Sequence, residues 1–316
     1  MNRPLAFLVL AHDDPPHLAR LCRRLAPHPV YVHLDAKAGP FERLGLDLPA
    51  NAMVIGRRHE VHWADFSVVE ATLALIEAAR ADGPAGHTVL LSGHCYPARP
   101  VAELQAFLAG APDADHIAMA AVGPASELRN NVGRRWRMAP YLPSRWRRRF
   151  PLLARADDLA RRVRNRLARA RRRDFAAEIA PATHYHGSQW WALTEESIHA
   201  IRREAAKPRW ASFRTTWAPD ETFFHTLVGA AAGRRQVADP DLGTRNLYRA
   251  PLHFVAETEG RWLRDGPALR QAIAGSSRFF VRKLGSAHAG LCDWLDGRVG
   301  DEADAGPARR RGLGRC

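Results

Sequence analysis

The chain has 316 residues, enough to bury a complete hydrophobic core, and a formal net charge of +14. No apolar run reaches the roughly 18 residues that a membrane-spanning helix needs, and acidic residues follow the first apolar segment too soon for a signal peptide. The cysteines lie far apart without CxxC spacing, which argues against a zinc site or a disulfide framework and predicts a reducing, cytoplasmic setting. These cysteines are Cys22, Cys95, Cys292 and Cys316.

Apolar segments that alternate with helical patterns organise the first 122 residues. Strands are predicted over 5–11, 30–35, 53–56, 88–93 and 117–122, and helices over 15–25, 65–76 and 103–108. This alternation predicts an α/β fold with a Rossmann-like, mostly parallel sheet and helices on both faces. In such sheets ligands bind beyond the carboxyl ends of the strands. The residues predicted at those ends are Asp35, Lys37, Ser92, Gly93, His94 and Cys95.

The positive charge is concentrated in residues 134–173. This segment has sixteen arginines and two acids, Asp157 and Asp158, so its net charge of 16 − 2 = +14 equals that of the whole chain. Its second half predicts an amphipathic helix with a stripe of Leu159, Val163 and Leu167. Three interpretations stay open: a solvated helix that covers the sheet, a surface for anionic lipid or a lipid-linked substrate, and a nucleic-acid surface. The last ranks third because no known nucleic-acid-binding motif accompanies the charge.

Two later stretches bring tryptophans and carboxylates together. Residues 184–194 predict a strand that contains Trp190 and Trp191 and ends at a helix start. Residues 217–225 predict a helix that begins at a proline, followed by Asp220 and Glu221. The acids can be ordinary helix N-terminal residues. They can also form a sugar site with a catalytic base, because aromatic faces stack on sugars and partial burial raises a carboxyl pKa.

The α/β architecture and a site of tryptophans and a glutamate suggest a nucleotide-sugar transferase. Such an enzyme must stabilise a departing diphosphate. Many such enzymes use a divalent metal held by an Asp-x-Asp pair after a central strand, but residues 90–97 contain no carboxylate. The triplets at 113–115 and 239–241 are interpreted as loop acids, and no converging set of oxygen ligands can be assembled. Fixed cationic side chains are the other solution. The candidates are Arg245, Arg282 and Lys283.

Six motifs, in order from residue 5 to about 285, resemble the core-2/I-branching β-1,6-N-acetylglucosaminyltransferases and the related peptide O-xylosyltransferases. The motifs are YVHLDAK (31–37), WADFS (63–67), LSGHCYP (91–97), GSQWW (187–191), PDE (219–221) and FVRK (280–283). One departure is Cys95, because the family usually has an acid at this position.

The resemblance implies a single GT-A type catalytic domain over residues 1–290, with 134–173 as a basic helical insertion; we expect a disordered tail over 300–316. It implies inverting, metal-independent transfer of a sugar, N-acetylglucosamine first and xylose second, from a UDP-sugar to an acceptor hydroxyl. Glu221 is the implied base, and Arg245, Arg282 and Lys283 the implied diphosphate ligands. His33, Asp35 and Lys37 are assigned to the nucleotide. Ser92, Gly93, Ser188, Trp190, Trp191 and Asp220 are assigned to the sugars.

Relatives in animals carry disulfides and a membrane anchor, and neither is visible here, so we expect a bacterial, cytoplasmic protein that contacts the inner membrane peripherally through 134–173. The expected acceptor is a carbohydrate, glycolipid or peptide hydroxyl in surface-glycan or glycolipid synthesis. No cofactor or metal is expected. The alternatives are a non-catalytic membrane- or nucleic-acid-binding protein on a transferase fold, and a metal-dependent transferase that uses Asp239 and Asp241.

Overall fold

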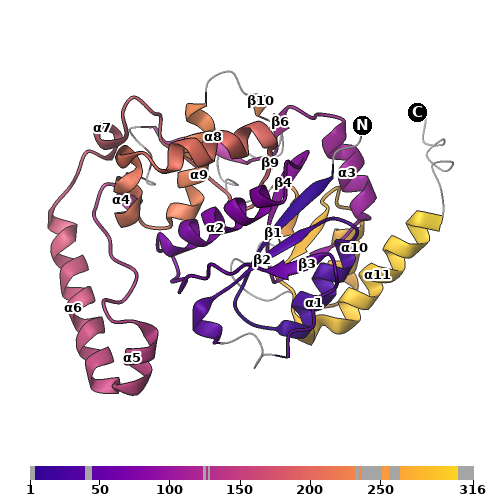
Figure 1. The fold of residues 1–316 in the computed structure, drawn as a ribbon, viewed down its shortest axis with the longest axis horizontal. Helices are drawn as coiled ribbons and strands as arrows, with labels where there is room; N and C mark the ends of the chain where they lie inside the picture. The colour runs from indigo at the N-terminus through magenta and orange to yellow at the C-terminus, as the bar shows by residue number, and fades with distance from the viewer. Residues whose placement is uncertain are drawn as a thin grey trace.

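A computed structural model describes residues 4–39, 45–123, 126, 129–231, 235–236, 251–255 and 264–304 (Figure 1). Arg245, Asp239 and Asp241 therefore lie outside the described residues. No helix of the described part is both long and apolar enough to cross a bilayer.

A five-stranded sheet forms the centre of the fold, in the order β3-β2-β1-β4-β9. Four neighbouring strands run parallel, whereas β9 pairs with β4 in the antiparallel sense. The strands are β1 (Leu5–Ala11), β2 (Val30–Leu34), β3 (Ala52–Val54), β4 (His87–Ser92) and β9 (Ala192–Thr194). The first four strands confirm the predicted ones to within about two residues, and the mostly parallel α/β sheet confirms the predicted fold class at this level.

Hydrophobic cores cover both faces of this sheet, because successive side chains of a strand point to opposite faces. On one face, Ala6 and Leu8 of β1 pack with α2, α8 and α9. On the other, Leu5, Phe7 and Val9 pack with α1 and α3. The helices are α1 (Pro15–Arg24), α2 (Ser67–Ala81), α3 (Val101–Ala109), α8 (Glu195–Ala205) and α9 (Phe223–Ala230).

A second sheet, β11-β12-β5, adjoins the carboxyl end of β4. Its strands are β5 (Cys95–Pro97), β11 (His253–Val255) and β12 (Phe280–Arg282), and β12 runs antiparallel to β5. Two helices, α10 (Pro267–Ala274) and α11 (Ala289–Asp304), complete this part of the fold, and both contribute to the third core. Because α11 continues to Asp304, the expected unstructured tail does not begin at residue 300. Residues 305–316 lie outside the described part.

Two short strand pairs differ from the predicted topology. The 117–122 segment forms only β7 (Met119–Ala121), which pairs with β8 (Tyr185–Gly187) away from the central sheet. Likewise β6 (Ala114–Asp115) pairs with β10 (Arg235–Gln236). The predicted 184–194 strand is therefore two strands, β8 and β9, which belong to different sheets. Residues 188–191 connect the two strands, and the Trp191 carbonyl still accepts the Leu90 N–H of β4 at 2.9 Å.

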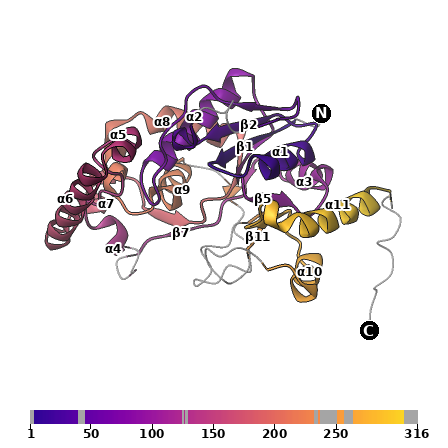
Figure 2. The ribbon, with the colours of Figure 1, turned by 90° about the horizontal axis from the view of Figure 1, so that it is seen from below.

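Residues 134–173 form an arm at the end of the molecule opposite α11 (Figures 1 and 2). The arm consists of an extended stretch, the short helix α5 (Ser144–Arg149) and the long helix α6 (Pro151–Ala170). Two small helices, α4 (Arg129–Val132) and α7 (Phe175–Ile179), flank it in sequence. The predicted helix exists, but it does not cover the sheet: Leu159, Val163 and Leu167 are 63%, 50% and 66% exposed. The first of the three interpretations of this segment is therefore wrong.

Candidate active site

The carboxyl ends of three parallel strands place polar residues at one edge of the central sheet. His12 and Asp13 follow β1, Asp35 follows β2, and Ser92 ends β4. Gly93 lies so close to β1 that a Cβ atom there would be 3.1 Å from the Cβ of Ala11. The strand register thus brings together residues that are about 80 positions apart in sequence, as the parallel-sheet argument predicted.

The predicted nucleotide residues form one connected group after β2. The Asp35 carboxylate accepts hydrogen bonds from the backbone N–H of Lys37 (2.8 Å) and Val61 (3.4 Å), and its Oδ2 lies 3.3 Å from Lys37 Nζ. His33 is buried, and its Nε2 accepts from the backbone N–H of His59 at 2.8 Å. Burial lowers the pKa of His33 to about 4, so its ring is neutral. This group holds the 56–66 loop against the sheet edge.

A second polar group joins this edge to the sheet of β5 and β12. His94 Nδ1 donates to the Leu284 carbonyl at 2.9 Å, and Nε2 lies 2.8 Å from Asp13 Oδ1. Burial lowers the pKa of Lys283, and the neighbouring Arg282 charge lowers it further, while Asp13 acts in the opposite direction. Lys283 therefore stands in the field of both Asp13 and Arg282, at the end of β12.

Arg282 is partly exposed and forms no ion pair with another described residue. Its guanidinium stacks over the Trp190 ring, 4.4 Å from the centroid, and its Nη1 is buried without a hydrogen-bond partner among the described residues. In the β5–β12 ladder it stands opposite Cys95, whose thiol pKa is raised by burial. A neutral thiol cannot balance a guanidinium, whereas the acid usual at this position in the similar enzymes could. The nearby His253 is also neutral, because burial lowers its pKa to about 3.

Glu221 ends a short 3₁₀ turn, η4 (Pro219–Glu221), directly before α9. The carboxylate is partly exposed, and its Oε2 lies 3.8 Å from Nε2 of the buried His186 on β8. Burial lowers the pKa of His186 to about 4. Glu221 thus has the neutral imidazole of His186 on its buried side and solvent on its exposed side. A partly exposed carboxylate in this position can accept a proton from an incoming hydroxyl.

Asp220 differs from its neighbour because its Oδ1 atom is buried and has no hydrogen-bond partner among the described residues, although the residue as a whole is partly exposed. Burial raises its pKa to about 6. Two adjacent carboxyl groups therefore sit in different environments, and a large difference of this kind is a common mark of functional sites.

Strained backbone surrounds these residues. The non-glycine residues with positive φ in the described chain are Asp14, Ala64 and Ala218, with φ of 53°, 54° and 46°. Ala218 immediately precedes η4 and donates its backbone N–H to the Ala64 carbonyl at 3.2 Å. Left-handed backbone disfavours side chains that carry a Cβ, and residues held there cluster at functional sites.

Three tryptophans form a platform beside Glu221. Trp63 and Trp217 meet edge to face with ring centroids 5.1 Å apart, and Trp136 contacts Trp217 at 5.7 Å. Trp63 remains 77% exposed. An indole that is held by a neighbour yet exposed suits the apolar face of a sugar ring.

The candidate residues are cations at the end of β12, the Glu221 carboxylate on η4 and the exposed indole of Trp63. Residues 5–142 match the Core-2/I-Branching enzyme family. This family consists of glycosyltransferases, so the match supports a glycosyltransferase activity with a sugar donor and a carbohydrate acceptor. The mixed α/β structure with a mostly parallel central sheet is compatible with a GT-A-like glycosyltransferase fold. Among curated proteins, none matches the chain.

The part that matches the Core-2/I-Branching family includes the β1, β2 and β4 ends and Trp63, whereas Glu221, Trp190, Arg282 and Lys283 lie outside it. The described contacts link Arg282 to Trp190, and Glu221 to His186, two residues before Ser188. Ser188 is buried and its carbonyl accepts from His225 Nε2 at 2.9 Å. The catalytic and binding roles of all these residues remain predictions.

Trp191 is the predicted sugar residue that the structure places elsewhere. Its ring is 1% exposed and packs on Phe224 in the core, with centroids 5.7 Å apart. Trp190 is also buried in this core, but its ring is stacked against Arg282. A packing role for Trp191 replaces the predicted sugar contact.

His12, Asp13, His186 and Trp217 were not assigned to the site from sequence, although the geometry includes them. The position of His12 and Asp13 directly after the first strand was an available signal, because the same argument selected Asp35. His186 and Trp217 lie within the stretches 184–194 and 217–225, but the pattern does not show which residues they contact, because tertiary structure sets those neighbours.

In one cluster the possible metal-ligating atoms lie close enough together to hold a cation. Ligand atoms of His12, Asp13 and His94 all lie within 4.8 Å of one another, which no other described group of three such residues does. The neighbouring Lys283 charge opposes a divalent cation at this position.

Proposed function

We propose that this protein is an inverting, metal-independent glycosyltransferase that moves a sugar from a UDP-sugar to an acceptor hydroxyl. N-acetylglucosamine is the favoured sugar and xylose the second. The observation that carries the proposal is the Arg282 guanidinium, which stacks on Trp190, precedes Lys283 and has no ion-pair partner among the described residues. A partly buried cation with one buried, unpaired nitrogen is stabilised by an anion, and a diphosphate would supply it.

In the proposed reaction, Glu221 accepts the proton of the acceptor hydroxyl as that oxygen attacks the anomeric carbon. The bond from the anomeric carbon to the diphosphate oxygen breaks on the opposite face, and UDP leaves with the bonding electron pair. One displacement converts an α-linked donor into a β-linked product. Arg282 and Lys283 stabilise the negative charge that develops on the leaving oxygen.

The remaining groups have supporting roles in this proposal. Asp35, with His33 and Lys37, borders the nucleotide, while Ser92, Gly93 and Ser188 line the donor sugar. Trp63 provides a stacking surface for the acceptor, because it is the exposed indole next to the segment of Glu221. Asp220 is protonated below about pH 6 and can then donate a hydrogen bond to a sugar oxygen.

The donor is tested by thermal shift with a panel of UDP-sugars in EDTA, since a ligand that binds only the folded state raises its melting temperature. We expect UDP-N-acetylglucosamine or UDP-xylose to raise the melting temperature of the wild-type protein. Arg282→Met should lose the shift, whereas Arg278→Met serves as a matched control on the same segment. A shift that needs Mn²⁺, or one that survives in Arg282→Met, would contradict the proposed diphosphate site.

The acceptor is proposed to be a bacterial surface-glycan or glycolipid precursor. A non-catalytic, basic binding protein is the alternative, favoured by the arginines of the arm. It predicts salt-sensitive binding to nucleic acid or anionic vesicles together with no UDP-sugar shift. The same thermal-shift panel therefore separates the two functions.

A further inference from the structure

An ordinary amphipathic surface helix packs its apolar side against the protein, whereas α6 packs its polar side against it. The polar side of α6 faces the protein: Asn165 exchanges hydrogen bonds with the backbone of Arg137 at 3.0 and 2.9 Å, and Arg164 donates to the Arg135 carbonyl at 3.3 Å. The buried Asp157 accepts from the backbone N–H of Tyr141 at 2.9 Å. The apolar side consequently faces away from the extended stretch that anchors the helix.

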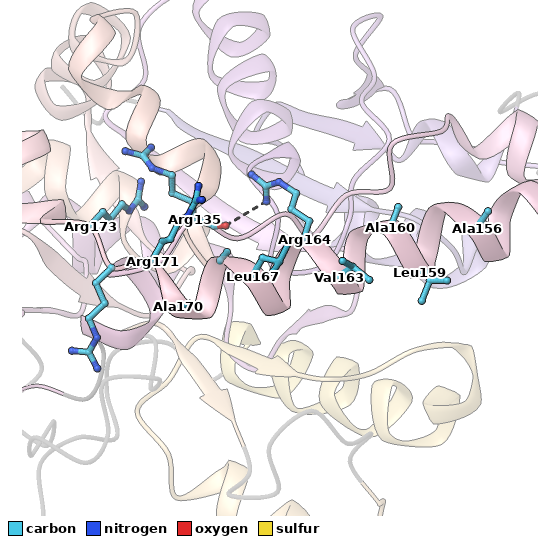
Figure 3. A pocket seen from close by; sticks show the side chains of 12 residues that line it. Arg135, Ala156, Leu159, Ala160, Val163, Arg164, Leu167, Ala170, Arg171 and Arg173 are labelled. Carbon is cyan, nitrogen blue, oxygen red and sulfur yellow. Dashed lines mark hydrogen bonds between the residues drawn. The ribbon is translucent and has the colours of Figure 1, made fainter.

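The outward side carries a continuous apolar stripe. Leu152, Leu159, Val163 and Leu167 follow one another at spacings of seven, four and four residues, which places them on one helix face. All four are at least half exposed, and Leu152 reaches 76%. Figure 3 shows Leu159 and Val163 projecting from α6, with the labelled arginines gathered toward the Leu167 end of the helix. A hollow of about 990 Å³ lies along the stripe and is bordered by Arg135, Arg164 and Arg171.

The acids of the arm do not offset the positive charge at its surface. Asp157 pairs with Arg147, and Asp158 lies 3.0 Å from Arg147 and 3.3 Å from Arg161. Both acids therefore serve to join α5 to α6. The exposed arginines that flank the stripe on α6 make no ion pair with another described residue; they are Arg155, Arg162 and Arg166.

We propose that α6 is an interfacial helix that docks the protein on an anionic lipid bilayer. An apolar stripe flanked by arginines matches a membrane surface, in which acyl chains take up the apolar side chains and anionic headgroups pair with the flanking charges. A duplex nucleic acid would satisfy the arginines but leave the leucines in water. A second copy of this chain would bring two strongly positive arms together.

The root of the arm links the docking helix to the candidate acceptor side. Trp136 donates its backbone N–H to the Thr215 carbonyl at 2.7 Å and packs on Trp217. Asp65 accepts from the Ala139 N–H at 3.1 Å, and Glu60 accepts from Ser144. Resting on the proposed function, this connection places the acceptor site next to the bilayer and selects a lipid-linked acceptor.

Vesicle binding tests the docking without any nucleotide or sugar. The full chain is sedimented with two kinds of sucrose-loaded vesicle. One is made of phosphatidylcholine alone, and the other of phosphatidylcholine with roughly 30–40 mol% phosphatidylglycerol. We expect binding to the anionic vesicles, which weakens as salt shortens the Debye length from about 10 Å at 0.1 M to about 3 Å at 1 M. No binding to the anionic vesicles overturns the proposal.

Two triple variants separate the apolar and the electrostatic contributions. Leu159→Ser/Val163→Ser/Leu167→Ser should weaken vesicle binding at least about tenfold, and Arg155→Gln/Arg162→Gln/Arg166→Gln should weaken it about 100-fold at low salt. Because all six side chains are exposed, these changes should leave the melting temperature and the UDP-sugar thermal shift unaltered.

The matched control removes the same charge elsewhere, with Arg23→Gln/Arg57→Gln/Arg203→Gln, and should bind as the wild type does. Equal weakening by this control means attraction by net charge alone and overturns the proposal. Unchanged vesicle binding of the Leu159/Val163/Leu167 variant also overturns the proposal. A third contrary outcome is that the wild type does not bind vesicles but self-associates, and that this variant abolishes the self-association. Loss of the UDP-sugar shift with retained vesicle binding would contradict the proposed function only.

Discussion

At the scale of single residues, the candidate site contains polar groups that lack a partner among the described residues. Arg282 faces a neutral thiol and a neutral imidazole, and Asp220 buries one carboxylate oxygen. Such groups lower the stability of the folded protein, so their persistence favours a role in binding or catalysis. An anionic ligand would balance the Arg282 guanidinium, whereas protonation below about pH 6 removes the charge of Asp220.

Asp220 makes a testable prediction about pH. Its folded-state pKa of about 6 lies above the ordinary value near 3.9, so the folded state holds this proton more tightly than the unfolded state does. Its contribution to stability is complete below about pH 4 and is lost as the pH rises to about 6. Asp220→Asn has no carboxyl proton to lose, so it escapes this destabilisation. The difference in melting temperature between Asp220→Asn and wild type should therefore shift in favour of the variant by a few degrees between pH 4 and pH 7.5, which corresponds to a free energy of unfolding on the order of 1–2 kcal/mol.

Thermal unfolding at these two pH values checks the prediction, with Asp113→Asn as the control because Asp113 is exposed. A melting-temperature difference between Asp220→Asn and wild type that does not change with pH would show that Asp220 is ionised in the folded protein at both.

The residue scale also limits what a sequence can provide. Asp35, Lys37 and Glu221 could be selected because each lies at a recognisable strand end or helix start. The difference between Trp190 and Trp191 could not be predicted, because it depends on a break between β8 and β9 that puts one ring over Arg282 and the other in the core.

At the scale of elements, β8 positions the floor of the site through an unusually close contact with β7. A Cβ atom on Gly187 would overlap the Ala118 carbonyl oxygen, so only glycine fits this ladder position. His186 and Ser188 flank this glycine. The close approach of the two strands therefore fixes the imidazole that faces Glu221.

Gly187→Ala should force these strands apart and move His186, which lowers the free energy of unfolding by about 1–3 kcal/mol and reduces sugar transfer as well. Denaturant unfolding and a transfer assay check both effects. The control is Gly123→Ala, since a Cβ at Gly123 meets no atom within 4 Å. If Gly187→Ala behaves like this control, the strand contact does not support the site.

Element boundaries were predicted well where the apolar pattern was long and poorly where it was short. β1, β2 and β4 were evident because their buried residues form continuous apolar runs. β7 and β9 have three residues each, too few for a periodic pattern to show which sheet they join.

At the scale of the whole molecule, the cations at the end of β12 lie in the second sheet next to the carboxyl end of β4, and the basic arm is rooted at Thr215 and Trp217. The α/β class and the sheet edge that carries the site followed from strand–helix alternation. The position of the arm did not, because a helix with leucines every three to four residues normally buries them. Here the hydrogen bonds of Asn165 and Asp157 hold the helix by its polar side instead.

The central claim is that fixed cations and a glutamate base transfer sugar without a metal ion. Its most direct test is the rate of UDP release from the donor that gives the thermal shift, measured in EDTA and in Mn²⁺. We predict equal wild-type rates in both, and a fall of at least about 10²-fold in Glu221→Gln with the donor-induced thermal shift retained. Activity that EDTA abolishes, or a Glu221→Gln variant as fast as the wild type, would contradict it.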